Sequence, residues 1–225
     1  MNDMNIRKIK RSSLAEEAMR ELRRLVLLGE LAPGSAVRER DMAEQLGISR
    51  TPLREAIQQL AVEGLIEYSA TRRPFVADPT IDEIRDGMTV MASLEALGGE
   101  QACENAGDAE IHRLGALHER MLKTSERGEP LEFFETDMAF HRTIIEAAHN
   151  SVLTDIHAQV NARLWRVRFL SSRMNKRRDR TLAQHSEIYE SIQARNPKRA
   201  AKAMRGHLET GIRNIQELLE EDSRP

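Results

Sequence analysis

The stretch Arg38–Leu60 reads RERDMAEQLGISRTPLREAIQQL, and its pattern predicts two short helices joined by a tight turn. Apolar residues recur at helical spacing on both sides of Gly47, a residue type that commonly ends a helix in the left-handed conformation. The second helix then opens with hydroxyl and guanidinium side chains, Ser49, Arg50, Thr51 and Arg54, of which Ser49 is a suitable N-cap. This arrangement is typical of a helix-turn-helix whose second helix enters the major groove of DNA. The alternative is a solvated helical hairpin within a larger bundle.

The flanking segments predict a small DNA-binding domain around this stretch. Residues 12–29 have the apolar periodicity of a helix, and a Pro-Gly turn follows at 31–34. Downstream, two short apolar runs flank a polar, basic tip at 69–74, which predicts a β-hairpin. A hairpin at this place is the wing of a winged helix, with Arg72 and Arg73 positioned to reach a phosphate or the minor groove. A plain surface hairpin is the alternative.

Composition restricts the class of protein. The chain has 225 residues, of which 40% are apolar and only 4% aromatic, so its core must be built from aliphatic side chains and Met. Such a composition favours helices over sheets. The net charge of −2 excludes a polycationic nucleic-acid binder, but residues 1–77 hold 13 Lys and Arg against 11 Asp and Glu. The sign of that local charge suits an N-terminal domain that faces phosphates.

Three further features indicate a cytoplasmic protein with no membrane partner. The single cysteine, Cys103, excludes an internal disulfide and fits a reducing compartment. No apolar run approaches the roughly 18 residues that a membrane span needs. The first residues lack the apolar core of a signal peptide.

The fold class expected is mainly α, an N-terminal winged helix-turn-helix followed by an all-helical bundle. Pro79 disfavours a helical conformation at Asp78, and every later segment has a helical pattern. We therefore expect a DNA-binding domain at 8–77, a linker at 78–83 and a bundle at 84–222. Within the bundle, the Gly98-Gly99 pair is a possible helix break. The basic run 173–180 is expected to be a solvated loop or helix end.

Four side chains of the bundle are candidates for a metal site. Asp137 and His141 stand at i and i+4, about 6 Å apart along one helix face. His185 and His207 lie almost equidistant from the turn at Asn196, so they come level if the two helices pack antiparallel. Three imidazoles and one carboxylate suit a divalent transition metal, with Zn²⁺ the first choice and Ni²⁺ or Mn²⁺ the alternatives. From spacing alone, an ordinary ion pair and two unrelated histidines explain the pattern equally well.

The N-terminal motifs resemble the DNA-binding domain of GntR-type bacterial transcription regulators. The resemblance rests on LGELAPG at 28–34, RERDMA at 38–43, LGISRTPLREA at 46–56 and EGLI at 63–66. It implies that operator DNA is contacted by the wing tip and by Arg40, Ser49, Arg50, Thr51 and Arg54. One departure is that the family usually has a glycine in the wing tip, where this chain has Arg73 followed by Pro74.

The C-terminal motifs resemble the FadR C-terminal (FCD) domain, a ligand-binding helical bundle. The matching residues are DMAFH at 137–141, Asn150, His185 and the His-Leu pair at 207–208. The resemblance implies that Asp137, His141, His185 and His207 bind a metal, and that a small carboxylate such as a sugar acid or organic acid binds at or beside it.

The bundle also departs from the FCD pattern. An arginine often precedes the glutamate matched by Glu95, and Met91 stands there instead; Asn196-Pro197 replaces a common Gly-Asp. Arg163 and Arg166 are candidate replacements for gripping the effector carboxylate, outward-facing surface residues being the alternative.

These features together predict a homodimeric, metal-containing transcription regulator that reads a pseudo-palindromic double-stranded operator. The resemblance favours a repressor of metabolic genes that a small carboxylate metabolite controls. The alternative function is a metal-dependent hydrolase or lyase with an appended DNA-binding domain, since three histidines and an aspartate could also hold a metal with a bound water. No general base stands beside the candidate ligands in the sequence, so we expect no enzyme.

Overall fold

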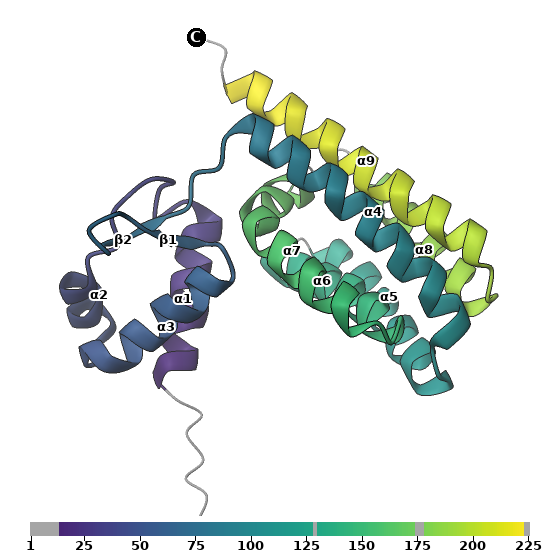
Figure 1. Cartoon of the computed structure of the whole chain (residues 1–225), viewed down its shortest axis with the longest axis horizontal. Coiled ribbons are helices and arrows are strands. Elements are labelled where there is room, and N and C mark those ends of the chain that lie inside the picture. The colour runs from purple at the N-terminus through teal and green to yellow at the C-terminus, as the bar shows by residue number, and fades with distance from the viewer. Residues whose placement is uncertain (1–13, 128–129, 174–177, 223–225) are drawn as a thin grey trace, which may run out of the picture. The chain divides into compact units, whose positions relative to one another are not determined.

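The computed structural model describes residues 14–127, 130–173 and 178–222 (Figure 1). The chain divides into two compact units, and the boundary between them along the sequence lies between Asp78 and Pro79. The first unit is a small mixed domain and the second is a helical bundle. The predicted fold class, a winged helix-turn-helix followed by an all-helical bundle, is confirmed.

The first unit contains α1 (Leu14–Leu28), α2 (Glu39–Leu46) and α3 (Arg50–Val62), followed by a two-stranded sheet. The apolar faces of α1 and α3 pack together, because their leucine, isoleucine and valine side chains recur every three or four residues. Fully buried side chains from both helices form this core: Leu22, Val26, Leu53, Ile57 and Leu60. Gly47 ends α2 at φ 64°, the left-handed conformation predicted for the turn.

The wing is an antiparallel hairpin of β1 (Ile66–Tyr68) and β2 (Pro74–Val76). Its turn is closed by two backbone hydrogen bonds between Ser69 and the residues at 72 and 73, of 2.8 and 3.0 Å. Arg72 adopts φ 57°, in the region that favours glycine. The left-handed position of this wing tip is therefore Arg72, one residue before the departure from the family pattern noted at Arg73.

The second unit is formed by α4 (Ile81–Asn105), α5 (Asp108–Arg127), α6 (Pro130–Ala147), α7 (Ser151–Ser172), α8 (Arg178–Gln193) and α9 (Pro197–Asp222). Figure 1 shows the two longest helices, α4 and α9, running side by side. Helix α4 begins inside the segment expected as a linker at 78–83. The reason is a capping box in which Thr80 and Glu83 satisfy each other's backbone N–H groups, at 3.3 and 2.8 Å. In the part of the chain described, no helix is long and apolar enough to cross a membrane.

Of the two readings left open for this stretch, one helix or two, the structure has one: α4 continues without interruption through Gly98 and Gly99. Both glycines are buried at helix crossings. A Cβ atom at Gly99 would lie 2.9 Å from Cγ of Met204 on α9, and a Cβ at Gly98 would clash with Cδ1 of Ile145 on α6. The pair therefore allows α6 and α9 to pack closely against α4.

Substituting Gly98→Val is expected to lower the free energy of unfolding by about 1–3 kcal/mol, because the added methyl groups overpack the crossing with α6. Urea unfolding followed by circular dichroism measures this change. Gly206→Ala in α9 is the matched control, since a Cβ there meets nothing within 4 Å. That control should stabilise the protein by up to about 1 kcal/mol through helix propensity. Equal stability of Gly98→Val and the parent chain would contradict close packing at this crossing.

The basic run 173–180 is only partly the solvated segment expected. Arg173 ends α7 and is exposed, and residues 174–177 lie outside the described part. Arg178 instead is only 9% exposed and lies over the Phe133 ring, 4.8 Å from its centroid. Burial lowers the pKa of this guanidinium. The aromatic ring compensates part of that cost through a cation–π contact.

Candidate DNA-binding surface and metal centre

All seven side chains predicted to contact DNA lie at the surface of the first unit: Arg40, Ser49, Arg50, Thr51, Arg54, Arg72 and Arg73. Three of them lie in the first turns of α3, the predicted recognition helix. Ser49 occupies the N-cap position, but its side chain makes no capping hydrogen bond. Its hydroxyl is therefore available to a phosphate oxygen.

The arginines of the recognition helix differ in their surroundings. Arg54 is held by Glu39 of α2 through an Nε–Oε2 contact of 2.6 Å. Arg50 is exposed and forms no ion pair with any described residue. A guanidinium that need not break an ion pair can make a bidentate contact to guanine at a lower cost in free energy. Arg50 is thus the leading candidate for base reading, with Arg54 oriented by Glu39.

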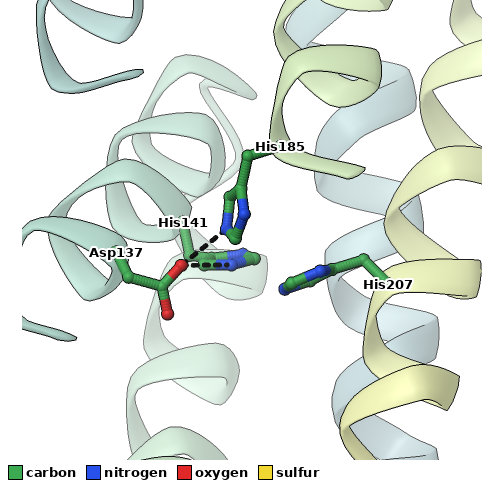
Figure 2. Close-up of side chains that lie close together, drawn as sticks. All are labelled: Asp137, His141, His185 and His207. Carbon is green, nitrogen blue, oxygen red and sulfur yellow. Dashed lines mark ion pairs between the residues drawn. The ribbon is translucent and has the colours of Figure 1, made fainter. Parts of the chain in front are cut away.

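The four candidate metal ligands converge in the interior of the bundle (Figure 2). Asp137 and His141 come from α6, His185 from α8 and His207 from α9. Each offers a ligand atom, and these atoms lie within 4.8 Å of one another. The rings of His185 and His207 are level across the α8–α9 turn, 4.4 Å between centroids, so the antiparallel packing predicted for this pair is confirmed.

A ring nitrogen of His185 and a carboxylate oxygen of Asp137 are in close contact at the centre of this cluster. The Nδ1 atom of His185 lies 2.8 Å from the backbone carbonyl of Thr181, which can only accept a hydrogen bond. In the neutral ring, the proton therefore sits on Nδ1 and leaves a lone pair on Nε2. That Nε2 lies 2.5 Å from Oδ1 of Asp137, which is also an acceptor. Such a contact needs positive charge, either a proton on Nε2 that makes the ring an imidazolium or a metal ion that both atoms bind.

His141 is oriented by a second carboxylate. Its Nδ1 lies 2.7 Å from Oε2 of Glu95, while its Nε2 lies 3.5 Å from Oδ1 of Asp137. Burial lowers the pKa of His141, but the negative charge of Glu95 and the contact with Asp137 outweigh this effect and raise the pKa to about 9. The two carboxylates thus favour the protonated, positively charged form of this ring. A carboxylate behind a histidine is also the usual support of a metal ligand.

The other two ligands have the protonation states that a metal requires. Burial alone raises the pKa of Asp137, but the neighbouring His185 and His141 hold it well below its ordinary value. Burial, reinforced by the charges of His185 and His141, lowers the pKa of His207 well below its ordinary value. The cluster therefore presents a carboxylate and a neutral imidazole.

Glu95 of α4 is the centre of a buried charge network that joins three helices. Its carboxylate is fully buried and contacts Nη1 of Arg168 at 2.9 Å and Nε2 of His157 at 3.3 Å, in addition to His141. Burial raises the pKa of Glu95, but the charges of His141 and Arg168 hold it well below its ordinary value. The carboxylate is therefore ionised and paired with Arg168.

Arg168 was not among the residues predicted from the sequence, which were two other arginines of α7. Arg163 is exposed and Arg166 is partly buried, and neither contributes to the cavity beside the metal cluster. Arg168 is 7% exposed and lines that cavity. A spacing signal was present, since Leu153, His157, Leu164 and Arg168 recur at intervals of four, seven and four on one helical face.

A small cavity of about 50 Å³ adjoins the cluster and is lined by side chains from α4, α6, α7, α8 and α9. Asp137 and His207 form one part of its wall, and Arg168 is the single arginine or lysine among the described lining residues. One water-sized group needs roughly 10–15 Å³ of such a cavity, so this cavity takes about three to five non-hydrogen atoms. It therefore suits a small ligand bound between a metal and a guanidinium.

Two family models match this chain. The model "Bacterial regulatory proteins, gntR family" matches residues 14–76, and the FCD domain model matches residues 86–210. The chain belongs to the GntR family of transcription regulators. This GntR regulator therefore binds DNA through its N-terminal unit, and its family consists of regulators rather than enzymes.

Similar proteins carry regulator names along most of the chain. The HTH-type transcriptional repressor RspR of Escherichia coli (strain K12) is 26% identical over 209 residues, 92% of this chain and 91% of the relative. An uncharacterized HTH-type transcriptional regulator in an unstable DNA locus of Streptomyces ambofaciens is 32% identical over 200 residues, 88% of this chain and 83% of the relative. Among solved structures, E. coli McbR/YncC has a TM-score of 0.75 at 20% identity, covering 92% of this chain and 99% of its own. That structural likeness shows the fold.

Proposed function

We propose that this GntR regulator holds one divalent transition metal in its FCD domain and binds a small carboxylate effector beside it, which changes operator binding. The observation that carries the proposal is the convergence of one carboxylate and three imidazoles, whose ligand atoms lie within 4.8 Å of one another in the interior of the bundle. The neighbouring buried nitrogens support it: among the described residues, Nδ1 of His207 makes no hydrogen bond, and Nε2 of His141 has only the Asp137 carboxylate at 3.5 Å. Unpaired buried polar atoms of this kind fit metal ligands.

The ligand set favours Zn²⁺ as the metal. Three imidazoles, from which a bound metal displaces any proton, and one carboxylate are common zinc donors, and Ni²⁺ or Mn²⁺ accept the same atoms. The surrounding groups fit this assignment, because Glu95 and the Thr181 carbonyl each hold the outer nitrogen of a ligand histidine. When bound, the metal would supply a positive charge that attracts an anionic effector.

Arg168 is the residue that we propose grips the effector carboxylate, in place of Arg163 and Arg166. Its Nη1 makes both of its hydrogen bonds, to Glu95 at 2.9 Å and to Asn161 at 2.8 Å. The donors on Nε and Nη2 therefore stay available to a ligand in the cavity that Arg168 lines. A guanidinium with two free donors matches a carboxylate in bidentate geometry.

The substitution Arg168→Met is expected to weaken the binding of small carboxylates to the metal-loaded protein by at least about 10-fold, because it removes a buried charge-assisted contact. A thermal-shift screen of small organic acids, run with and without chelator, identifies the ligand, and calorimetry measures the loss. Arg163→Met, exposed on the same helix, is the matched control and should leave affinity unchanged. If Arg163→Met weakened binding and Arg168→Met did not, the site assignment would be wrong.

We further propose that the protein acts as a homodimer on a pseudo-palindromic operator, since two-fold symmetry matches two recognition helices to two half-sites. Helices α4 and α7 pack together, and each has exposed apolar side chains on one face. Val90 and Leu97 of α4 are 48% and 40% exposed, and Val152 and Ile156 of α7 are 65% and 43% exposed. A second copy of this chain is the occupant we assign to this face, because a self-complementary apolar surface suits an isologous contact.

Repression of metabolic genes is the mode of action we propose. RspR is described as a repressor, and a relative from Paenarthrobacter nicotinovorans is described as the probable D-xylose utilization operon repressor. The metal-dependent hydrolase or lyase considered as an alternative gains no support from any of these relatives. A reporter fused to the operator tests the sign: deleting the regulator should raise expression, and a fall would show an activator.

A further inference from the structure

We propose that Gln184 makes the effector cavity selective for a small carboxylic acid that bears a hydroxyl group. This inference rests on the proposed function, because it places a carboxylate effector in the same cavity. Gln184 lies on α8 directly before the ligand His185, and its side chain lines the cavity together with Asp137, Arg168 and His207.

The side-chain amide of Gln184 is oriented by α9. Its Nε2 donates to Oγ1 of Thr210 at 3.0 Å and to the backbone carbonyl of Gly206 at 3.5 Å. Because a carbonyl can only accept, the nitrogen must occupy this side of the amide, and the oxygen must lie on the other. The Thr210 hydroxyl supports this assignment, since it donates its own proton to the same carbonyl at 2.9 Å.

The amide oxygen of Gln184 is therefore an acceptor held in a fixed position, and no donor among the described residues pairs with it. Its Oε1 is buried and makes no hydrogen bond with any described residue. A buried acceptor pays a desolvation cost unless a ligand supplies a donor. A hydroxyl group supplies one, whereas a methylene or methyl group at the same place leaves the oxygen unpaired. A second carboxylate oxygen would be repelled.

The charges around the cavity distinguish a hydroxyl from an ammonium donor. Arg168 and the proposed divalent metal together would contribute three positive charges, and the carboxylates of Glu95 and Asp137 offset only two of them. An amino group, protonated near neutral pH, would add a further positive charge beside them, whereas a hydroxyl adds none. The cavity holds only about three to five non-hydrogen atoms, so the acid must be short. Glycolate has this size and chemistry, lactate is one non-hydrogen atom larger, and both serve as probes.

The test compares matched acids on the full-length protein loaded with Zn²⁺, by isothermal calorimetry. The pairs are glycolate against acetate, and lactate or 3-hydroxypropionate against propionate, with glycine and alanine as the ammonium analogues. In the parent protein, at least one hydroxylated acid should bind about 10–100-fold more tightly than its partner, because a site with an unpaired polar group rejects the analogue that lacks the donor. In Gln184→Met, which keeps the length of the side chain but accepts poorly, that preference should fall to about 3-fold or less.

Two controls separate selectivity from damage to the fold or the metal site. Zinc content and thermal unfolding without acid should be the same in Gln184→Met and the parent. Gln193→Met, at an exposed position near the end of α8, should keep the parent's preference.

Equal binding of every pair by the parent, an unchanged preference in Gln184→Met, or tighter binding of the ammonium analogues would each overturn the role of Gln184 while leaving a carboxylate site in place. If no acid binds at all, the proposed function fails, and the inference fails with it.

Discussion

Replacing His185 with alanine is expected to lower the affinity for Zn²⁺ by more than about 100-fold. Losing a supporting residue behind a metal ligand typically costs about 10–100-fold, and losing a ligand itself should cost more. His185 is fully buried and its Nε2 is the atom closest to Asp137, so the substitution removes one of four donors from the centre of the cluster. Elemental analysis after dialysis, followed by competition with a chromophoric chelator, measures the change.

The loss of zinc affinity should be smaller when a residue that supports a ligand is replaced than when a ligand itself is replaced. Glu95→Gln keeps all four ligands but weakens the orientation of His141, so a loss of about 10–100-fold is expected. His112→Ala, at an exposed histidine of α5, should have no effect. Zinc should also raise the melting temperature of the parent protein but not of His185→Ala, because only the folded state of the parent binds it tightly. Full zinc content in His185→Ala would refute the four-ligand site.

The substitution Arg50→Ala is expected to weaken operator binding by about 1–3 kcal/mol, roughly 5- to 150-fold, and to relax the preference at one base position of each half-site. The reason is that Arg50 stands in the first turn of α3, exposed and without an ion-pair partner in the described chain. Fluorescence anisotropy with the parent operator and single-base variants, at one fixed salt concentration, measures both effects.

Two other arginines provide the comparison for Arg50. Arg54→Ala should cost less, because Arg54 must share its guanidinium with Glu39 at 2.6 Å. Arg20→Ala, exposed on α1, removes the same charge outside the recognition helix and should change affinity little. If Arg50→Ala and Arg20→Ala behaved alike, Arg50 would be contributing only general electrostatic attraction. Footprints that protect a single half-site would contradict the proposed homodimer.

Much of the DNA-binding unit could be predicted from the sequence because its signals are local. The Gly47 turn, the N-cap position of Ser49 and the hairpin at 66–76 depend on residues only a few positions apart. The two halves of the metal cluster were also accessible, since Asp137 and His141 share a helix and the α8–α9 turn sets the level of His185 and His207. Each of these pairings needs a helical period and one short connection. That the two pairs converge depends on distant packing and was implied only by the resemblance to the FCD domain.

The arginine beside the cluster could not be chosen in the same way. Arg163, Arg166 and Arg168 all lie on α7 within six positions, and a buried charge is unfavourable unless a partner compensates it. For Arg168 that partner is Glu95, 73 positions away on α4. Gly98-Gly99 posed the same problem, because a glycine pair indicates either a break or a close crossing.

The helices, the turns and the wing could be predicted from the sequence, because hydrogen bonds and apolar periodicity within short segments dictate these elements, and the spacing of Asp and His residues indicated the candidate ligands. Tertiary structure alone decided which arginine enters the interior, which helices cross at Gly98, and which oxygen of the cavity lacks a donor. Those outcomes depend on contacts between residues far apart in the chain. Burial makes such contacts strong, and only the packed bundle brings their partners together.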